Sequence, residues 1–140
     1  MLLFKRLFEG NKSNRMIASF EKVTLRESGM RYVVEYEIVM KEDRAEVSQY
    51  EISFAEKEAR RILKKRMISD TDAVIKLLND CALILWDGFH GSHPKGIKDG
   101  IMFILEATVN ENTNVYAEGS QNFPKHYKEF KDGLKRLLNG

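Results

Sequence analysis

The chain has 140 residues, of which 43% are hydrophobic and 31% are charged. This balance excludes a disordered chain, which would lack the apolar surface needed to offset chain entropy, and the length suits one ordinary domain. The 23 Lys and Arg residues nearly balance the 21 Asp and Glu residues, so no broad field attracts nucleic acid or anionic lipid. We therefore expect a single domain over residues 1–140 and no nucleic-acid partner.

The cysteine count and the start of the chain bear on the compartment. Cys81 is the only cysteine, so the chain cannot form an internal disulfide. The opening shows no secretory signal, and no stretch reaches the about 20 apolar residues that a membrane-spanning helix needs. We therefore expect a cytoplasmic protein with no membrane span.

Apolar side chains dominate residues 2–8, with Lys5 and Arg6 between them. This pattern predicts a short helix that docks on its own domain and ends near Gly10. A helix that lies on a membrane surface is the alternative.

Twofold alternation of apolar and polar residues begins near Ile17 and predicts a meander of antiparallel strands. Residues 17–26 predict an irregular first strand. Residues 32–40 place apolar side chains on one face and glutamates on the other, and residues 50–54 repeat this alternation. One face of the meander should therefore pack on the core.

Residues 59–68 fit either a helix or a fourth strand of the meander. We prefer the strand, in which Leu63, Lys65 and Met67 share a face. Basic side chains crowd the segment from Arg60 to Arg66 and could form a phosphate-binding stripe. A solvated face or a charged edge strand explains them more simply.

Residues 69–72 carry a helix-start signal, and apolar residues at helical spacing then predict a helix that ends near Cys81. A long glycine-rich loop from Trp86 to Gly100 follows. Residues 101–109 predict a central strand, and residues 115–118 predict the second arm of a hairpin.

Pro124 suits the first position of a final amphipathic helix. The fold class is therefore α+β. Its elements are an antiparallel meander of three to four strands, a helix, the long loop, a β-hairpin and a C-terminal amphipathic helix. The helices should cover one face of the sheet.

The glycine-rich loop concentrates the residues that could carry a function. It holds the only tryptophan, two of the three histidines and four of the nine glycines. Aromatic anchors surrounded by adaptable polar groups are typical of binding surfaces on rigid scaffolds. Together with residues 120–127, the loop is our candidate binding surface. Its candidate residues are Trp86, Asp87, Phe89, His90, His93, Lys95, Asn122, Phe123 and His126.

Two chemical alternatives use the same loop. A transition metal could bind His90, His93 and Asp87, although paired ligands at zinc-site spacing are absent from the sequence. General acid–base or nucleophilic catalysis could use either histidine as the base and Ser92 or Ser120 as the nucleophile. Nothing in the spacing fixes the mutual geometry of these groups.

A structural explanation of the loop is also open. Trp86 and Phe89 would turn inward as apolar anchors, and Asp87 and Asp99 would accept backbone N–H bonds in turns. The glycines would permit the bends.

The second half of the chain carries distinctive blocks: Asn79-Asp-Cys81, Trp86-Asp-Gly-Phe-His-Gly-Ser-His-Pro-Lys95, Asp99-Gly-Ile-Met-Phe103, Ala107-Thr-Val-Asn110, Ala117-Glu-Gly-Ser120 and Asn122-Phe-Pro-Lys125. These blocks resemble a family of small uncharacterised proteins from Firmicutes, chiefly clostridial ones. The resemblance covers about the last 70 residues. It implies a bacterial cytoplasmic protein of one domain, and it implies no role for any histidine.

We therefore expect a small non-enzymatic binding or interaction module that uses residues 86–100 and 120–127, takes an unidentified protein or small molecule, and needs no cofactor. The alternative is a metal-dependent or histidine-based enzyme with its site at Asp87, His90 and His93. Exposed strand edges also permit a homodimer.

Overall fold

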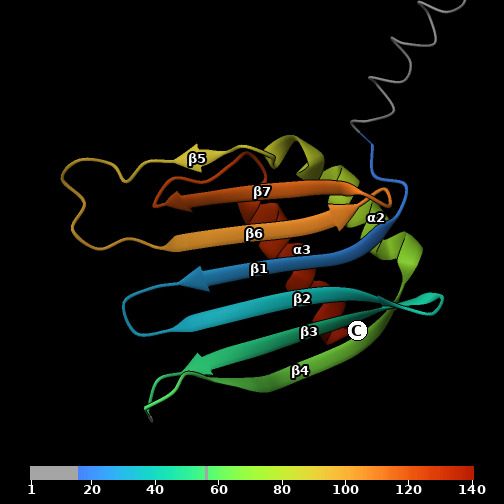
Figure 1. The fold of residues 1–140 in the computed structure, drawn as a ribbon, viewed down its shortest axis with the longest axis horizontal. Helices are drawn as coiled ribbons and strands as arrows, with labels where there is room; N and C mark the ends of the chain where they lie inside the picture. The colour runs from blue at the N-terminus through green and yellow to red at the C-terminus, as the bar shows by residue number, and fades with distance from the viewer. Residues whose placement is uncertain (1–15, 56) are drawn as a thin grey trace, which may run out of the picture.

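The computed structural model describes residues 16–55 and 57–140, so the predicted opening helix lies outside the described residues. Seven strands form one sheet in the order β4-β3-β2-β1-β6-β7-β5 (Figure 1). Neighbouring strands are antiparallel except for β5, which runs parallel to β7. The strands are β1 (Phe20–Ser28), β2 (Val33–Lys41), β3 (Arg44–Ser53), β4 (Arg60–Asp70), β5 (His90–Gly91), β6 (Met102–Val109) and β7 (Thr113–Ser120).

The helices pack on one face of this sheet. The helix α2 (Thr71–Asp80) follows β4, and α3 (Tyr127–Asn139) crosses behind the strands in Figure 1. A short 3-10 helix, η1 (Leu83–Trp86), leads from α2 into the loop. The opposite face carries no helix among the described residues, and we call it the open face. The predicted α+β class is confirmed.

No described helix is long and apolar enough to cross a membrane.

The sheet is larger than the predicted meander. β1 pairs with β2 on one side and with β6 on the other, so Leu25 lies between Tyr36 and Leu105. The meander and the hairpin are therefore parts of one sheet, not separate pieces. Alternation along a strand shows which of its faces is buried, but it does not identify the strand's neighbours.

The strand predicted at residues 59–68 is confirmed as β4, which lies at one edge of the sheet. A β-bulge interrupts its pairing: Gln49 lies opposite Lys65, but the next residue, Tyr50, lies opposite Leu63. The extra residue turns Leu63 toward the open face, while the Lys65 ammonium reaches a side chain of α3 on the other side. The predicted shared face of Leu63, Lys65 and Met67 is therefore wrong.

The start of α2 lies within the predicted residues 69–72, whereas α3 starts later than predicted. α2 begins at Thr71 directly after β4, and the side chain of its N-cap residue Asp70 makes no capping hydrogen bond. α3 begins at Tyr127, not at Pro124, and its N-cap residue His126 has a left-handed backbone with a φ of 70°. Neither helix therefore depends on a side-chain cap.

The core fills the space between the sheet and the helices. α3 contributes Phe130, Leu134 and Leu138 at helical spacing, and all three are buried. Cys81 is also a buried core residue, and burial raises the pKa of its thiol to about 11. The thiol therefore stays protonated and unreactive at neutral pH.

A buried carboxylate, Glu27 of β1, ties the sheet to α3. Its oxygens accept hydrogen bonds from the hydroxyls of Tyr32 at 3.1 Å and Tyr127 at 2.6 Å, and the Lys131 ammonium lies 2.8 Å away. Burial tends to raise the pKa of Glu27, but the hydrogen bonds from Lys131 and Tyr127 outweigh this effect and hold the pKa below its ordinary value. Burial and the bond to Glu27 raise the pKa of Tyr127, which therefore stays a donor.

Candidate functional site

The glycine-rich loop is fastened along the edge of β7. The Gly88 N–H donates to the Tyr116 carbonyl at 2.9 Å, and the Phe89 carbonyl accepts from the Glu118 N–H at 3.1 Å. The Asp87 carboxylate accepts from the Tyr116 N–H at 2.9 Å. The loop therefore satisfies backbone groups at this edge of the sheet. It also contains β5, a short strand that the sequence did not predict.

Replacement of Asp87 by alanine should lower the free energy of unfolding by about 1 kcal/mol, because the Tyr116 N–H loses its acceptor. Asp87→Asn keeps an acceptor oxygen and is the matched control, with an expected loss below about 0.5 kcal/mol. Urea denaturation of the three proteins measures both losses. An alanine variant as stable as the wild type would show that the carboxylate is free for another role.

The two loops predicted to share a surface lie side by side. The Asn122 side-chain amide donates to the Ser92 carbonyl at 3.3 Å, and the Trp86 indole N–H donates to the Lys125 carbonyl at 3.1 Å. The backbone of Asn122 also passes close to Gly119, where a Cβ would lie 2.2 Å from the Asn122 carbonyl oxygen. Only glycine leaves room for this approach.

The three predicted aromatic binding residues pack inward. Trp86 is 3% exposed, and its ring meets the Phe130 ring edge-on with the centroids 5.5 Å apart. Phe89 and Phe123 are half-buried and pack on Phe103, with centroid separations of 6.1 and 5.6 Å. These three side chains pack against the core and support the two loops.

The two histidines of the loop have separate partners. His90 Nδ1 lies 2.9 Å from a carboxylate oxygen of Glu118. His93 Nδ1 lies 2.8 Å from Ser120 Oγ, and His93 Nε2 contacts the Ile97 carbonyl oxygen. Within residues 16–55 and 57–140, no three His, Cys, Asp or Glu side chains are grouped to hold a metal ion. The structure therefore brings together His93 and Ser120 from the catalytic alternative, and it does not assemble the metal alternative.

The remaining predicted residues occupy other places. Lys95 and Asn122 are exposed, and His126 is the half-buried N-cap residue of α3. Neither Lys95 nor His126 lines the hollow that His90 and His93 border beside β6 and β7.

A hollow of about 270 Å³ lies where the loop meets the open face of β6 and β7, and we call it the loop hollow. Met102 and Ile104 line it with exposed apolar side chains. The polar residues around it are His90, Ser92, His93, Glu118 and Ser120.

Sequence reasoning did not select Met102, Ile104 or Glu118. A signal for the first two was nevertheless present, because residues 101–109 are apolar on both faces at their start and only one face can meet the helices. An apolar group on the solvent face of a strand needs a separate explanation.

The β2–β4 half of the open face is covered by its own arginines. The Arg61 guanidinium lies 3.4 Å from the centroid of the Tyr50 ring and pairs with Glu35 at 2.7 Å and with Glu37 at 2.8 Å. Arg66 donates to the Tyr50 hydroxyl at 2.8 Å. These long side chains bury Tyr50 and Glu35 although no helix covers them. The cations are therefore already engaged within the chain.

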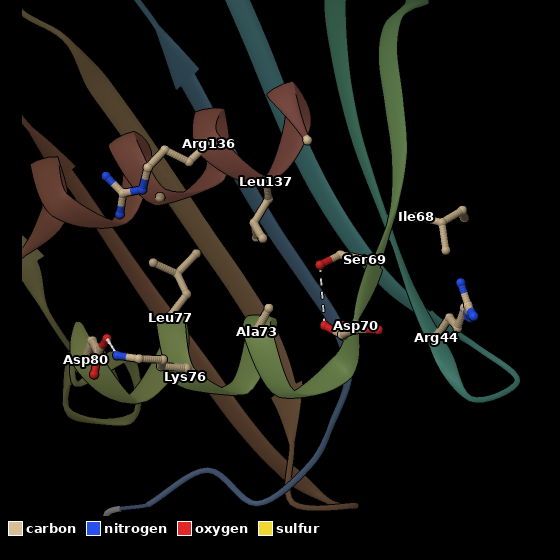
Figure 2. A pocket seen from close by; sticks show the side chains of 12 residues that line it. Arg44, Ile68, Ser69, Asp70, Ala73, Lys76, Leu77, Asp80, Arg136 and Leu137 are labelled. Carbon is tan, nitrogen blue, oxygen red and sulfur yellow. Dashed lines mark hydrogen bonds and ion pairs between the residues drawn. The ribbon is translucent and has the colours of Figure 1, made fainter.

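A second concavity, about 480 Å³, runs between α2 and α3 (Figure 2). Leu77 and Ala73 of α2 face Leu137 of α3 across it, and Lys76 pairs with Asp80 at 2.6 Å on its rim. Cations and anions are mixed around this groove, so it shows no preference for one charge of ligand. None of the candidate binding residues predicted from the sequence lines this groove.

No family model, no curated protein and no solved structure matches this chain. The resemblance to uncharacterised Firmicutes proteins stays a prediction.

Proposed function

We propose that this chain is a binding module for a small molecule and that the loop hollow is its ligand site. The observation that carries this proposal is that exposed apolar side chains and polar groups meet around one hollow of the open face. Arg61 and Arg66 cover Tyr50 in the β2–β4 half, whereas Met102 and Ile104 of β6 are exposed and line the loop hollow. Exposed apolar surface beside a few convergent polar groups is the usual composition of a ligand site.

The size of the hollow favours a small ligand. Its volume of about 270 Å³ lies just below the about 300–1,000 Å³ of sites that enclose drug-sized molecules. The polar groups lie at one side, where Glu118 accepts from the Tyr116 hydroxyl at 2.9 Å and pairs with His90. A short apolar chain with a hydrogen-bonding end fits this arrangement.

A cytoplasmic, bacterial setting is part of the same proposal and rests on the sequence. Nucleic acid is not the proposed ligand, because Arg61 and Arg66 already pair with glutamates of the chain itself.

NMR titration of isotope-labelled protein with butyramide and butan-1-ol should move the amide resonances of β6, β7 and residues 90–101. Ile104→Lys should weaken this binding by at least about tenfold, because an apolar ligand would have to desolvate the new charge. Leu63→Lys is the matched control and should leave binding unchanged. Leu63 is 45% exposed and Ile104 is 40% exposed, but Leu63 lies on β4 of the same face and does not line the loop hollow.

Three results would contradict the proposal: no shifts with either compound, shifts that cluster at the α2–α3 groove, or equal weakening by the two lysine variants. The first would show that the hollow binds no short apolar chain. The other two would place the binding elsewhere.

A further inference from the structure

Ser120 and His93 form a polar pair at the edge of the loop hollow. Ser120 is the last residue of β7, and its hydroxyl oxygen lies 2.8 Å from His93 Nδ1. The other ring nitrogen, Nε2, contacts the carbonyl oxygen of Ile97 in the same loop. A carbonyl oxygen can only accept a hydrogen bond, so a neutral His93 must carry its proton on Nε2.

The tautomer decides the direction of the second hydrogen bond. With the proton on Nε2, His93 Nδ1 presents a lone pair, and the Ser120 hydroxyl donates to it. A histidine that accepts the proton of a serine hydroxyl and is held in place by a third group is the arrangement of an activated nucleophile. In this chain the Ile97 carbonyl is the group that positions the base.

We propose that Ser120 is a nucleophile that attacks small carboxylic esters, with His93 as its general base and the loop hollow as the seat of a short acyl chain. The acyl seat rests on the proposed function, whereas the nucleophile rests on the geometry of the Ser120–His93 pair. Met102 and Ile104 supply the apolar surface next to the hydroxyl.

The reaction is an acyl transfer through Ser120. The hydroxyl oxygen forms a bond to the ester carbonyl carbon while its proton passes to His93 Nδ1. The bond between that carbon and the alcohol oxygen then breaks, and the alcohol leaves with the proton from His93. Water attacks the acyl-serine in the same way and releases a carboxylic acid, which restores the free hydroxyl.

A butyl-chain fluorophosphonate tests the nucleophile directly. In this reaction the Ser120 oxygen bonds to phosphorus, fluoride leaves and the proton passes to His93. Peptide mass spectrometry of the full chain should find the adduct on Ser120 and lose it in Ser120→Ala. His93→Asn should slow labelling on the order of a hundredfold. Ser53→Ala, which removes a serine of β3 that does not line the loop hollow, should react at the wild-type rate.

Two results would contradict the assignment of Ser120 as a nucleophile activated by His93. One is a wild-type chain without an adduct on Ser120, and the other is a His93→Asn variant that is labelled at the wild-type rate. The fluorescence of the single tryptophan, Trp86, checks the fold of each variant, and His93→Gln replaces His93→Asn if the latter unfolds.

A comparison of ester substrates tests whether the acyl chain binds in the loop hollow. Hydrolysis of p-nitrophenyl butyrate should exceed that of the acetate by up to about tenfold in kcat/KM, because two more methylenes are buried. Equal rates with labelled Ser120 would show that the acyl chain does not bind in the loop hollow, whereas the NMR titration tests the proposed ligand site by itself. If NMR shows binding but Ser120 forms no adduct, the proposed binding function stands and the assignment of Ser120 as a nucleophile fails.

Discussion

Trp86→Ala should lower the free energy of unfolding by about 3–5 kcal/mol, the usual loss when a large aromatic side chain leaves a core. The Trp86 ring is 3% exposed, packs edge-on against Phe130, and donates its N–H to the Lys125 carbonyl. Domains of this size are stable by only about 5–15 kcal/mol, so the loss is a large share of the total. Urea denaturation followed by circular dichroism measures it, since the variant has no tryptophan left to report.

Lys95→Ala is the control on the same loop. Lys95 is exposed, and its replacement should change stability by less than about 0.5 kcal/mol. The comparison separates the two roles that the sequence allows for Trp86. A stable Trp86→Ala variant that no longer binds ligand would assign Trp86 to the binding surface, against its position in the structure.

Glu27→Ala should lower the free energy of unfolding by about 3–5 kcal/mol. The substitution removes the carboxylate that accepts from the Lys131 ammonium and the Tyr127 hydroxyl between the sheet and α3. Glu27→Gln keeps an acceptor oxygen and should lose less. The double variant Glu27→Leu/Lys131→Met should recover part of the loss, because neither charge is then left unpaired. If the losses of the single variants Glu27→Leu and Lys131→Met add up to the loss of the double variant, Glu27 and Lys131 do not interact.

The same carboxylate makes stability depend on pH in a defined direction. The folded-state pKa of Glu27 lies below the ordinary value of 4.5, so its ionised form stabilises the fold above that pH. As the pH falls from 4.5 through the folded-state pKa, this stabilisation is lost. The wild type should therefore lose its advantage over Glu27→Gln in acid, as measured by Tm from neutral to acidic pH. An unchanged difference in Tm would contradict the lowered pKa.

Much of the fold follows from local patterns. Apolar patterns predicted the strands except β5, and helical spacing predicted α2 and α3, because one face of each element must be buried. The join between meander and hairpin was not predictable in this way, since it depends on β1 pairing with β6 far along the chain. The bulge opposite Gln49 and Tyr50 was also not predictable, because one extra residue moves the Leu63 side chain to the other face of the sheet without any change in composition.

The position of the candidate site in the chain was predictable, but its contacts were not. Glycines and histidines indicated the loop, which pairs with β7 beside a hollow in the structure. Composition could not separate Trp86, which packs in the core, from His93, which lies at the surface. The pairing of His93 with Ser120 depends on how the loop crosses the end of β7, and no spacing in the sequence encodes that path.

β1 lies in the middle of the sheet although it is synthesised before every other strand described here. On the ribosome, β2 can pair with one edge of β1 almost at once, whereas the other edge must wait for β6. Until the hairpin emerges, that edge exposes unpaired backbone groups to neighbouring nascent chains. The long-range pairing also slows folding. A chain truncated after α2 should therefore aggregate, and the hairpin completes the domain as well as supporting the loop hollow.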